Sequence, residues 1–160
     1  MRVLHRVTRG TATRRLPCPR DVDPWFIGDD WVNCAVVRVA QPYSQSEFML
    51  VGSNLCQPGS VLEGEPISKC PATSLLGLTL FYFEQAVEER SFLVIEGAAL
   101  DRGGPILYRS LLVPLSEDDK KVDAVLIAAN SRACRQGEYT GPATRLVWSH
   151  GFGAHRGDRA

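Results

Sequence analysis

Apolar and β-branched residues concentrate in five short runs along the chain. These runs occupy residues 33–40, 47–52, 92–97, 106–115 and 122–129. Such runs, bounded by Gly, Pro or polar residues, are typical of β-strands. The runs do not alternate with helices in a regular βαβ rhythm, so we expect the strands to pair antiparallel in one sheet.

One longer apolar segment separates the second run from the third. Apolar side chains recur at helical spacing through residues 75–90, and Thr73 or Ser74 can cap a helix that begins there. The preceding residues 53–72 contain too many Gly and Pro residues for a long element. The sequence therefore predicts an α+β fold in which helices pack on one face of a five-stranded antiparallel sheet.

Both ends of the chain differ in composition from its centre. Residues 1–20 contain six arginines and no acid, which gives them the look of a transit peptide, and residues 135–160 are rich in Gly and polar side chains. We expect a basic flexible arm at 1–20, a folded domain at 21–134 and a flexible tail at 135–160. A nucleic-acid-binding surface would have aromatic residues between the arginines, and this segment has none. No nucleic-acid partner is therefore predicted.

The overall composition is that of an ordinary globular domain. The 160 residues are 44% hydrophobic and 22% charged, and their formal net charge is zero. The uncharged run at 70–83 is shorter than the roughly 18 residues of a membrane-spanning helix, so no membrane span is predicted. Five cysteines without a CxxC pair favour reduced thiols in a cytoplasmic protein over a disulfide framework or a zinc site.

The element order and two stretches of sequence resemble the PAS family. A PAS fold has two strands, short helical segments, a longer helix and three more strands. Two regions resemble small stand-alone PAS-like proteins of alphaproteobacteria. The first region combines Arg-Asp-Val-Asp-Pro-Trp-Phe-Ile at 20–27 with Phe-Met-Leu-Val-Gly at 48–52. The second region combines Tyr-Arg-Ser-Leu-Leu-Val-Pro-Leu-Ser at 108–116 with Val-Asp-Ala-Val-Leu at 122–126. The resemblance covers residues 14–133 and implies a sensory or protein-interaction module of bacterial signalling, without enzymatic activity.

The alternation of side chains along a strand separates an inward face from an outward one. Charges at Arg38, Glu47, Glu96 and Arg109 mark the outward positions. The predicted inward residues are Val37, Leu50, Leu93, Ile95, Tyr108, Ser110 and Leu112, which face Leu76 and Phe83 of the helix. These nine would line a cavity for a small apolar ligand, with Tyr108 and Ser110 as polar anchors. The alternative is a filled core without a cavity.

The outward positions also carry apolar residues. Cys34, Val36, Phe92 and Val94 share the parity of the outward charges, which places apolar groups on a face that ought to meet water. A homodimer or a signalling-protein partner is expected to cover them.

Signals for a cofactor or a catalytic centre are weak in this chain. No His lies between His5 and His150, which disfavours haem, and the spacing of Gly-Ser-Asn-Leu-Cys-Gln at 52–57 does not fit a flavin-reactive cysteine. We therefore predict no enzyme and no metal site, and the cofactor is unknown. The alternative is a small α+β enzyme or ligand carrier with Tyr108 and Glu96 as its acid and base.

Overall fold

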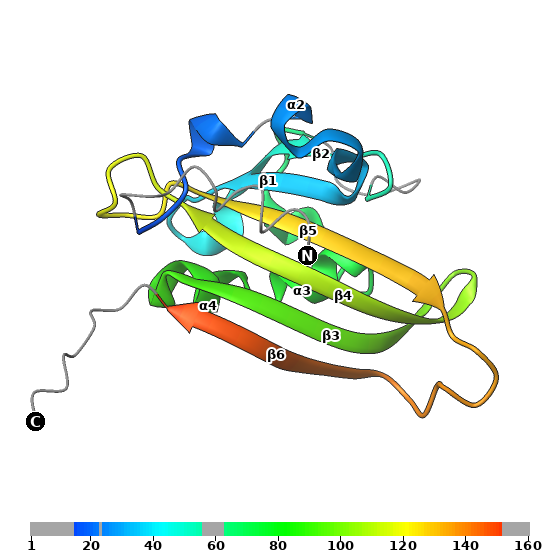
Figure 1. Ribbon diagram of the computed structural model, residues 1–160. Coiled ribbons are helices and arrows are strands. Elements are labelled where there is room, and N and C mark those ends of the chain that lie inside the picture. Colours follow the sequence, from blue (N-terminus) through cyan, green and yellow to red (C-terminus); the bar gives the residue numbers. More distant parts are fainter. Residues whose placement is uncertain (1–14, 23, 56–62, 152–160) are drawn as a thin grey trace, which may run out of the picture.

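Six antiparallel strands form one open sheet in the spatial order β2-β1-β5-β4-β3-β6 (Figure 1). The computed structural model describes residues 15–22, 24–55 and 63–151. The strands are β1 (Cys34–Arg38), β2 (Glu47–Val51), β3 (Ser91–Asp101), β4 (Gly104–Leu115), β5 (Ala124–Ala133) and β6 (Ala143–Gly151). The predicted α+β class with an antiparallel sheet is confirmed, but the sheet has six strands where the sequence predicts five.

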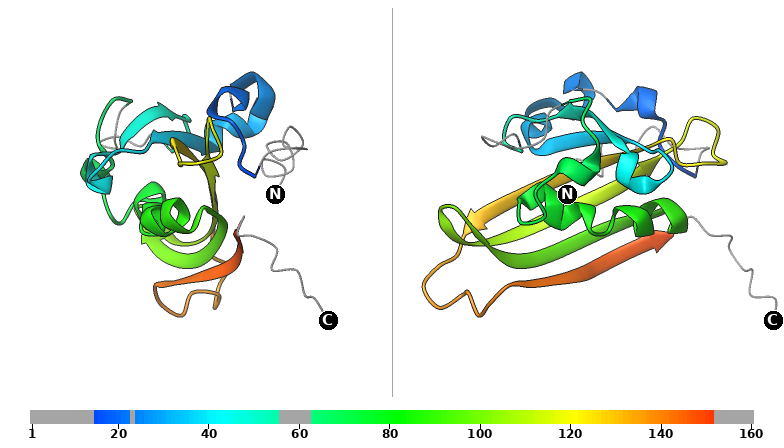
Figure 2. Two further views of the ribbon diagram at one scale, coloured as in Figure 1. Left: turned by 90° about the vertical axis from the view of Figure 1, so that its left-hand side faces the viewer. Right: turned by 180° about the vertical axis from the view of Figure 1, so that it is seen from behind.

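Two helices cover one face of the sheet, called here the inner face (Figure 2). They are α3 (Leu75–Leu80) and α4 (Phe83–Glu89). The Ser74 hydroxyl caps α3 by accepting a hydrogen bond from the Gly77 amide at 3.0 Å. The sequence predicts one continuous helix, whereas the Tyr82 amide donates to the Thr79 carbonyl in a tighter turn that divides it.

The N-terminal segment covers part of the opposite face, called here the outer face (Figure 2). It contains η1 (Pro19–Asp21), α2 (Pro24–Ile27) and η2 (Gly28–Asn33). Leu16 and Ile27 are fully buried in one apolar cluster with Val113 and Leu126 of the sheet. The prediction of helices on one face only is therefore wrong, because central strands that are apolar on both faces need a cover on each.

Hydrogen bonds fix the start of the N-terminal segment to the turn between β4 and β5. The Asp119 carboxylate accepts hydrogen bonds from the amides of Arg15, at 3.1 Å, and Leu16, at 2.9 Å. The Ser116 amide donates to the Pro17 carbonyl at 2.8 Å. The predicted flexible arm is therefore wrong for residues 15–20, and its residues 1–14 lie outside the described residues.

The apolar residues that were expected to meet water are buried within the chain. Cys34, Val36, Phe92 and Val94 are each at most 5% exposed and belong to the outer apolar cluster with Leu16. Covering these residues does not require a second chain, so this premise for a homodimer is wrong.

The segment that was predicted to be a flexible tail contributes a strand. β6 pairs antiparallel with β3, from Ala98 opposite Ala143 to Ser91 opposite Gly151, with a bulge near Val94. The tail prediction is therefore wrong for 143–151, because pairing with β3, which is distant in the sequence, orders this segment. Residues 152–160 lie outside the described residues.

The far edge of β2 is covered by the chain that follows it. Short turns lie on either side of this strand: η3 (Tyr43–Gln45) and η4 (Ile67–Lys69). The Phe48 amide donates to the Glu65 carbonyl at 3.0 Å, and the Gly64 amide donates to the Phe48 carbonyl at 2.7 Å. These bonds occupy backbone groups that an edge strand otherwise exposes. Within the described ranges, no helix is long and apolar enough to cross a membrane.

The burial of Leu16 makes the N-terminal segment part of the core. Replacing a fully buried leucine with alanine removes apolar contact and leaves a cavity, so Leu16→Ala is expected to lower the free energy of unfolding by about 2–5 kcal/mol. Leu100→Ala is the matched control, because Leu100 is 60% exposed and its truncation should change stability by less than about 0.5 kcal/mol. Urea unfolding measures both, and equal midpoints for the two variants would contradict this packing.

Candidate functional site

Eight of the nine predicted pocket residues lie together on the inner face. They are Val37, Leu76, Phe83, Leu93, Ile95, Tyr108, Ser110 and Leu112, and each is at most 4% exposed. All except Ser110 belong to one apolar cluster between the sheet and the two helices. Strand parity therefore assigned these side chains to the correct face.

Leu50 is the exception. A bulge in the β1–β2 pair places Val37 opposite Phe48 and Val36 opposite Leu50, so that Met49 is the extra residue. Phe48 is fully buried in the inner cluster, whereas Leu50 packs against the outer cluster. The inward assignment of Leu50 is wrong, because one extra residue reverses the facing of every residue beyond it.

The Ser110 hydroxyl takes part in a buried chain of hydrogen bonds. The Thr79 hydroxyl donates to the Leu75 carbonyl at 2.9 Å and lies 2.7 Å from the Ser110 hydroxyl. Since the Thr79 proton is already used, Ser110 is the donor to Thr79. These hydrogen bonds join α3 to β4, and they use the Ser110 hydroxyl proton that was expected to anchor a ligand.

The Tyr108 ring crosses β3 to reach β6. Its hydroxyl is hydrogen bonded to the Thr144 hydroxyl at 2.5 Å. The ring lies over Gly97, where a Cβ atom would come within 2.5 Å of the ring and within 2.4 Å of the Ala143 carbonyl. Burial raises the pKa of Tyr108. The second expected ligand anchor therefore links β6 to the sheet.

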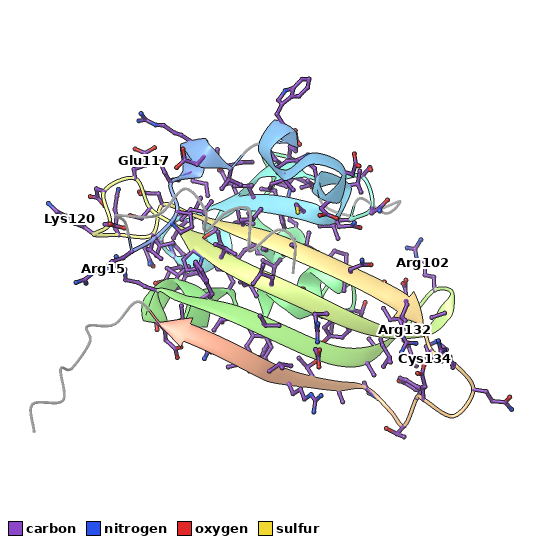
Figure 3. All side chains as sticks on the ribbon, in the orientation of Figure 1. Arg15, Arg102, Glu117, Lys120, Arg132 and Cys134 are labelled. Carbon is purple, nitrogen blue, oxygen red and sulfur yellow. The ribbon has the colours of Figure 1, made fainter. Side chains whose placement is uncertain are left out.

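The outer face contains an open groove where the N-terminal segment does not cover it. The groove has a volume of about 770 Å³ and spans four neighbouring strands, β5, β4, β3 and β6. One wall is the loop from residue 134 to 142, which contributes Glu138, Thr140 and Gly141. Figure 3 places Arg132 at the end of β5, at the opposite end of the sheet from Arg15 and Lys120.

Strand register arranges the groove residues in two rows, because directly paired residues share a face. The charged row is Asn130, Arg109, Glu96 and Arg145. The second row is Arg132, Leu107, Ala98 and Ala143. Because three members of the second row are small or aliphatic, this row forms an apolar floor beside the charged one.

Ion pairs hold the groove arginines in place. The Glu96 carboxylate accepts hydrogen bonds from Arg109, through Nε at 2.6 Å and also through Nη2, and from Arg145 at 3.3 Å. The hydrogen bond from Arg109 is the main cause that lowers the pKa of Glu96. Glu96 therefore stays ionised at neutral pH and fixes two guanidinium groups on the outer face.

A second ion pair shapes the wall of the groove. Arg132 donates two hydrogen bonds to Glu138, at 2.8 and 3.0 Å, in a bidentate arrangement. The Arg135 amide donates to the same carboxylate at 2.6 Å. These hydrogen bonds lower the pKa of Glu138 to about 2, and those from Arg132 have the larger effect. The loop is thereby tied to the end of β5.

A second hollow, of about 730 Å³, lies near β1 and the turn between β4 and β5. Its charged lining residues are Arg38, Glu117, Lys121 and Asp123. Two bases and two acids leave no net charge to select a ligand, so the outer groove is the stronger candidate.

The residues of the alternative enzymatic interpretation do not form one site. Tyr108 faces the inner cluster, whereas Glu96 lies on the outer face in ion pairs with two arginines. Burial, with a smaller effect from Asp30, raises the pKa of the Cys34 thiol to about 12, the reverse of an activated nucleophile. Among the residues that the structure describes, no group of His, Cys, Asp or Glu is arranged to hold a metal ion.

Sequence reasoning missed most of the groove. It marked Arg109 and Glu96 as outward charges but assigned Arg145 and the loop to a tail. The available signal was the run Leu-Val-Trp at 146–148, since β-branched and aromatic residues favour a strand. Comparison with protein families, curated proteins and solved structures finds no match for this chain.

The hydrogen-bonded packing around Ser110 predicts that enlarging this side chain destabilises the protein. Ser110→Leu forces extra volume into the inner core and removes the bond to Thr79, so it should lower the free energy of unfolding by about 1–3 kcal/mol. Ser131→Leu is the control, because Ser131 also lies on a strand but is exposed. Thermal melts compare them, and a stabilised Ser110→Leu variant would show that an empty cavity exists there.

The close packing of the Tyr108 ring over Gly97 predicts that position 97 accepts only glycine. In Gly97→Ala, the new Cβ meets a backbone carbonyl and the tyrosine ring, so β3 and β6 must separate, at a cost of about 1–3 kcal/mol. Gly103→Ala is the matched control, because nothing lies within 4 Å of a Cβ at Gly103. Urea unfolding measures both variants, and a Gly97→Ala protein as stable as the control would contradict the close approach.

Proposed function

We propose that this chain is a PAS-like adaptor or sensor module of bacterial signalling, which works in the cytoplasm and acts by binding another protein through its outer groove. The observation that carries the proposal is the groove itself, an open hollow with an apolar floor and a row of fixed charges on a sheet. The element order supports it, since β1 and β2, the short helices and then β3, β4 and β5 follow the order on which the resemblance to PAS domains rests, with β6 added at the end.

Contact with a protein fits these observations better than a ligand enclosed in the core. The two polar groups expected to anchor such a ligand, Ser110 and Tyr108, are hydrogen bonded to Thr79 and Thr144 instead. The side chains around them are buried against one another. The outer groove, in contrast, has exposed side chains such as Arg145, which is 77% exposed.

A different protein fits the groove better than a second copy of this chain. A twofold dimer presents the same surface on both sides. The groove lining holds three arginines and two glutamates, so two facing grooves would bring their excess positive charges together. We therefore propose a separate signalling protein as the partner.

Photo-crosslinking in cells tests where the partner binds. A benzophenone side chain in place of Ala143 lies in the groove, whereas the same group in place of Glu84 lies exposed on α4, on the inner face. The proposal predicts that the Ala143 probe yields one discrete adduct and the Glu84 probe does not. Adducts from Glu84 alone, or from neither position, would refute binding through the outer groove.

A further inference from the structure

The outer groove carries a charge opposite to that of the described chain as a whole. The described residues hold 12 bases and 16 acids, whereas the groove lining holds three arginines against two glutamates. The side chains of Arg109, Arg132 and Arg145 are 54–77% exposed despite their ion pairs. A guanidinium group has five donors, so each arginine keeps donors for a ligand. The local field therefore favours an anionic partner.

The positions of these arginines set a length for the ligand. Arg132 lies in the second row on β5, whereas Arg145 lies in the charged row on β6, three strand spacings across the sheet and two residues along β6 from Ala143. This arrangement corresponds to a separation of about 16 Å. In an extended peptide, side chains four residues apart are separated by about 13 Å and point the same way. The long side chains of glutamate and arginine span the remaining difference, so two carboxylates at this spacing can reach both arginines at once.

The floor between the two arginines selects the residue in the middle. Leu107 and Ala98 occupy the centre of the second row, and Ala98 is half-buried with a side chain too small to fill the space. The residue midway between the two carboxylates of an extended peptide points at this floor. An aliphatic side chain there would bury apolar surface.

We infer that the outer groove binds an extended acidic segment of the partner protein, in which two carboxylates four residues apart flank an aliphatic side chain. This inference rests on the proposed function and names the chemistry of its partner. The carboxylates pair with Arg132 and Arg145, and the aliphatic group lies on Leu107 and Ala98. Arg109 contributes positive charge from the neighbouring row.

A synthetic peptide tests this recognition with the full chain. The probe is fluorescein-labelled Gly-Glu-Ser-Leu-Ser-Glu-Gly, and fluorescence anisotropy reports its binding. Saturable binding is expected, about tenfold weaker when both glutamates are replaced by glutamine, and weaker at high salt because the pairs are exposed. A peptide with serine in place of leucine should also bind more weakly.

Protein variants locate the binding surface. Arg145→Gln removes one of the two pairs and should weaken binding of the probe by about threefold, and Ala143→Glu should abolish it, because it brings negative charge into the groove. Arg20→Gln is the matched control, since Arg20 is an exposed arginine in an ion pair with Glu117, away from the groove. It should leave the affinity unchanged.

Several results would overturn the inference. They are the absence of saturable binding, equal affinity for the glutamine peptide, wild-type affinity in Arg145→Gln, or tighter binding of a single-stranded oligonucleotide, which would identify a phosphate site. If crosslinking at Ala143 captures a partner while the peptide fails to bind, only the acidic-segment inference is wrong. If both experiments fail, the proposed function is wrong as well.

Discussion

The structure depends on one constraint, which is that the central strands are apolar on both faces. Along β5, Val125 and Ile127 belong to the inner cluster, while Ala124 and Leu126 belong to the outer one. Each face must therefore be removed from water by a different part of the chain. Helices α3 and α4 cover the inner face, and the N-terminal segment from residue 15 covers the outer face near β1.

The two covers also explain where the groove lies. The long strands β3, β4 and β5 extend beyond the N-terminal segment, and the outer face of their far halves changes from buried apolar residues to charged, small or partly exposed aliphatic ones. β6 and the loop from residue 134 to 142 add a wall and a fourth strand there. The groove is thus the part of the outer face that no described segment covers, and its charged row keeps it compatible with water.

Sequence reasoning recovered what depends on local pattern. Strand alternation placed Tyr108 and Ser110 on the inner face and Arg109 on the outer one, since each strand is regular over those residues. It failed at Leu50, because a bulge shifts the register. It also failed at Leu16 and at β6, because both are ordered by contacts with residues far away in the sequence. The groove combines local and distant elements, so only its β3 and β4 charges were predictable.

Methyl-selective nuclear Overhauser measurements on the full chain test the two-cover account most directly. The account predicts contacts from the methyl groups of Leu16 and Ile27 to those of Val113, Leu115 and Leu126, which share the outer cluster. It also predicts contacts from Leu76 to Leu112 or Ile127 of the inner cluster, and none from Leu16 to the inner set. Absence of the Leu16 contacts, with rapid exchange of the Leu16 amide, would contradict the claim that the N-terminal segment is the second cover.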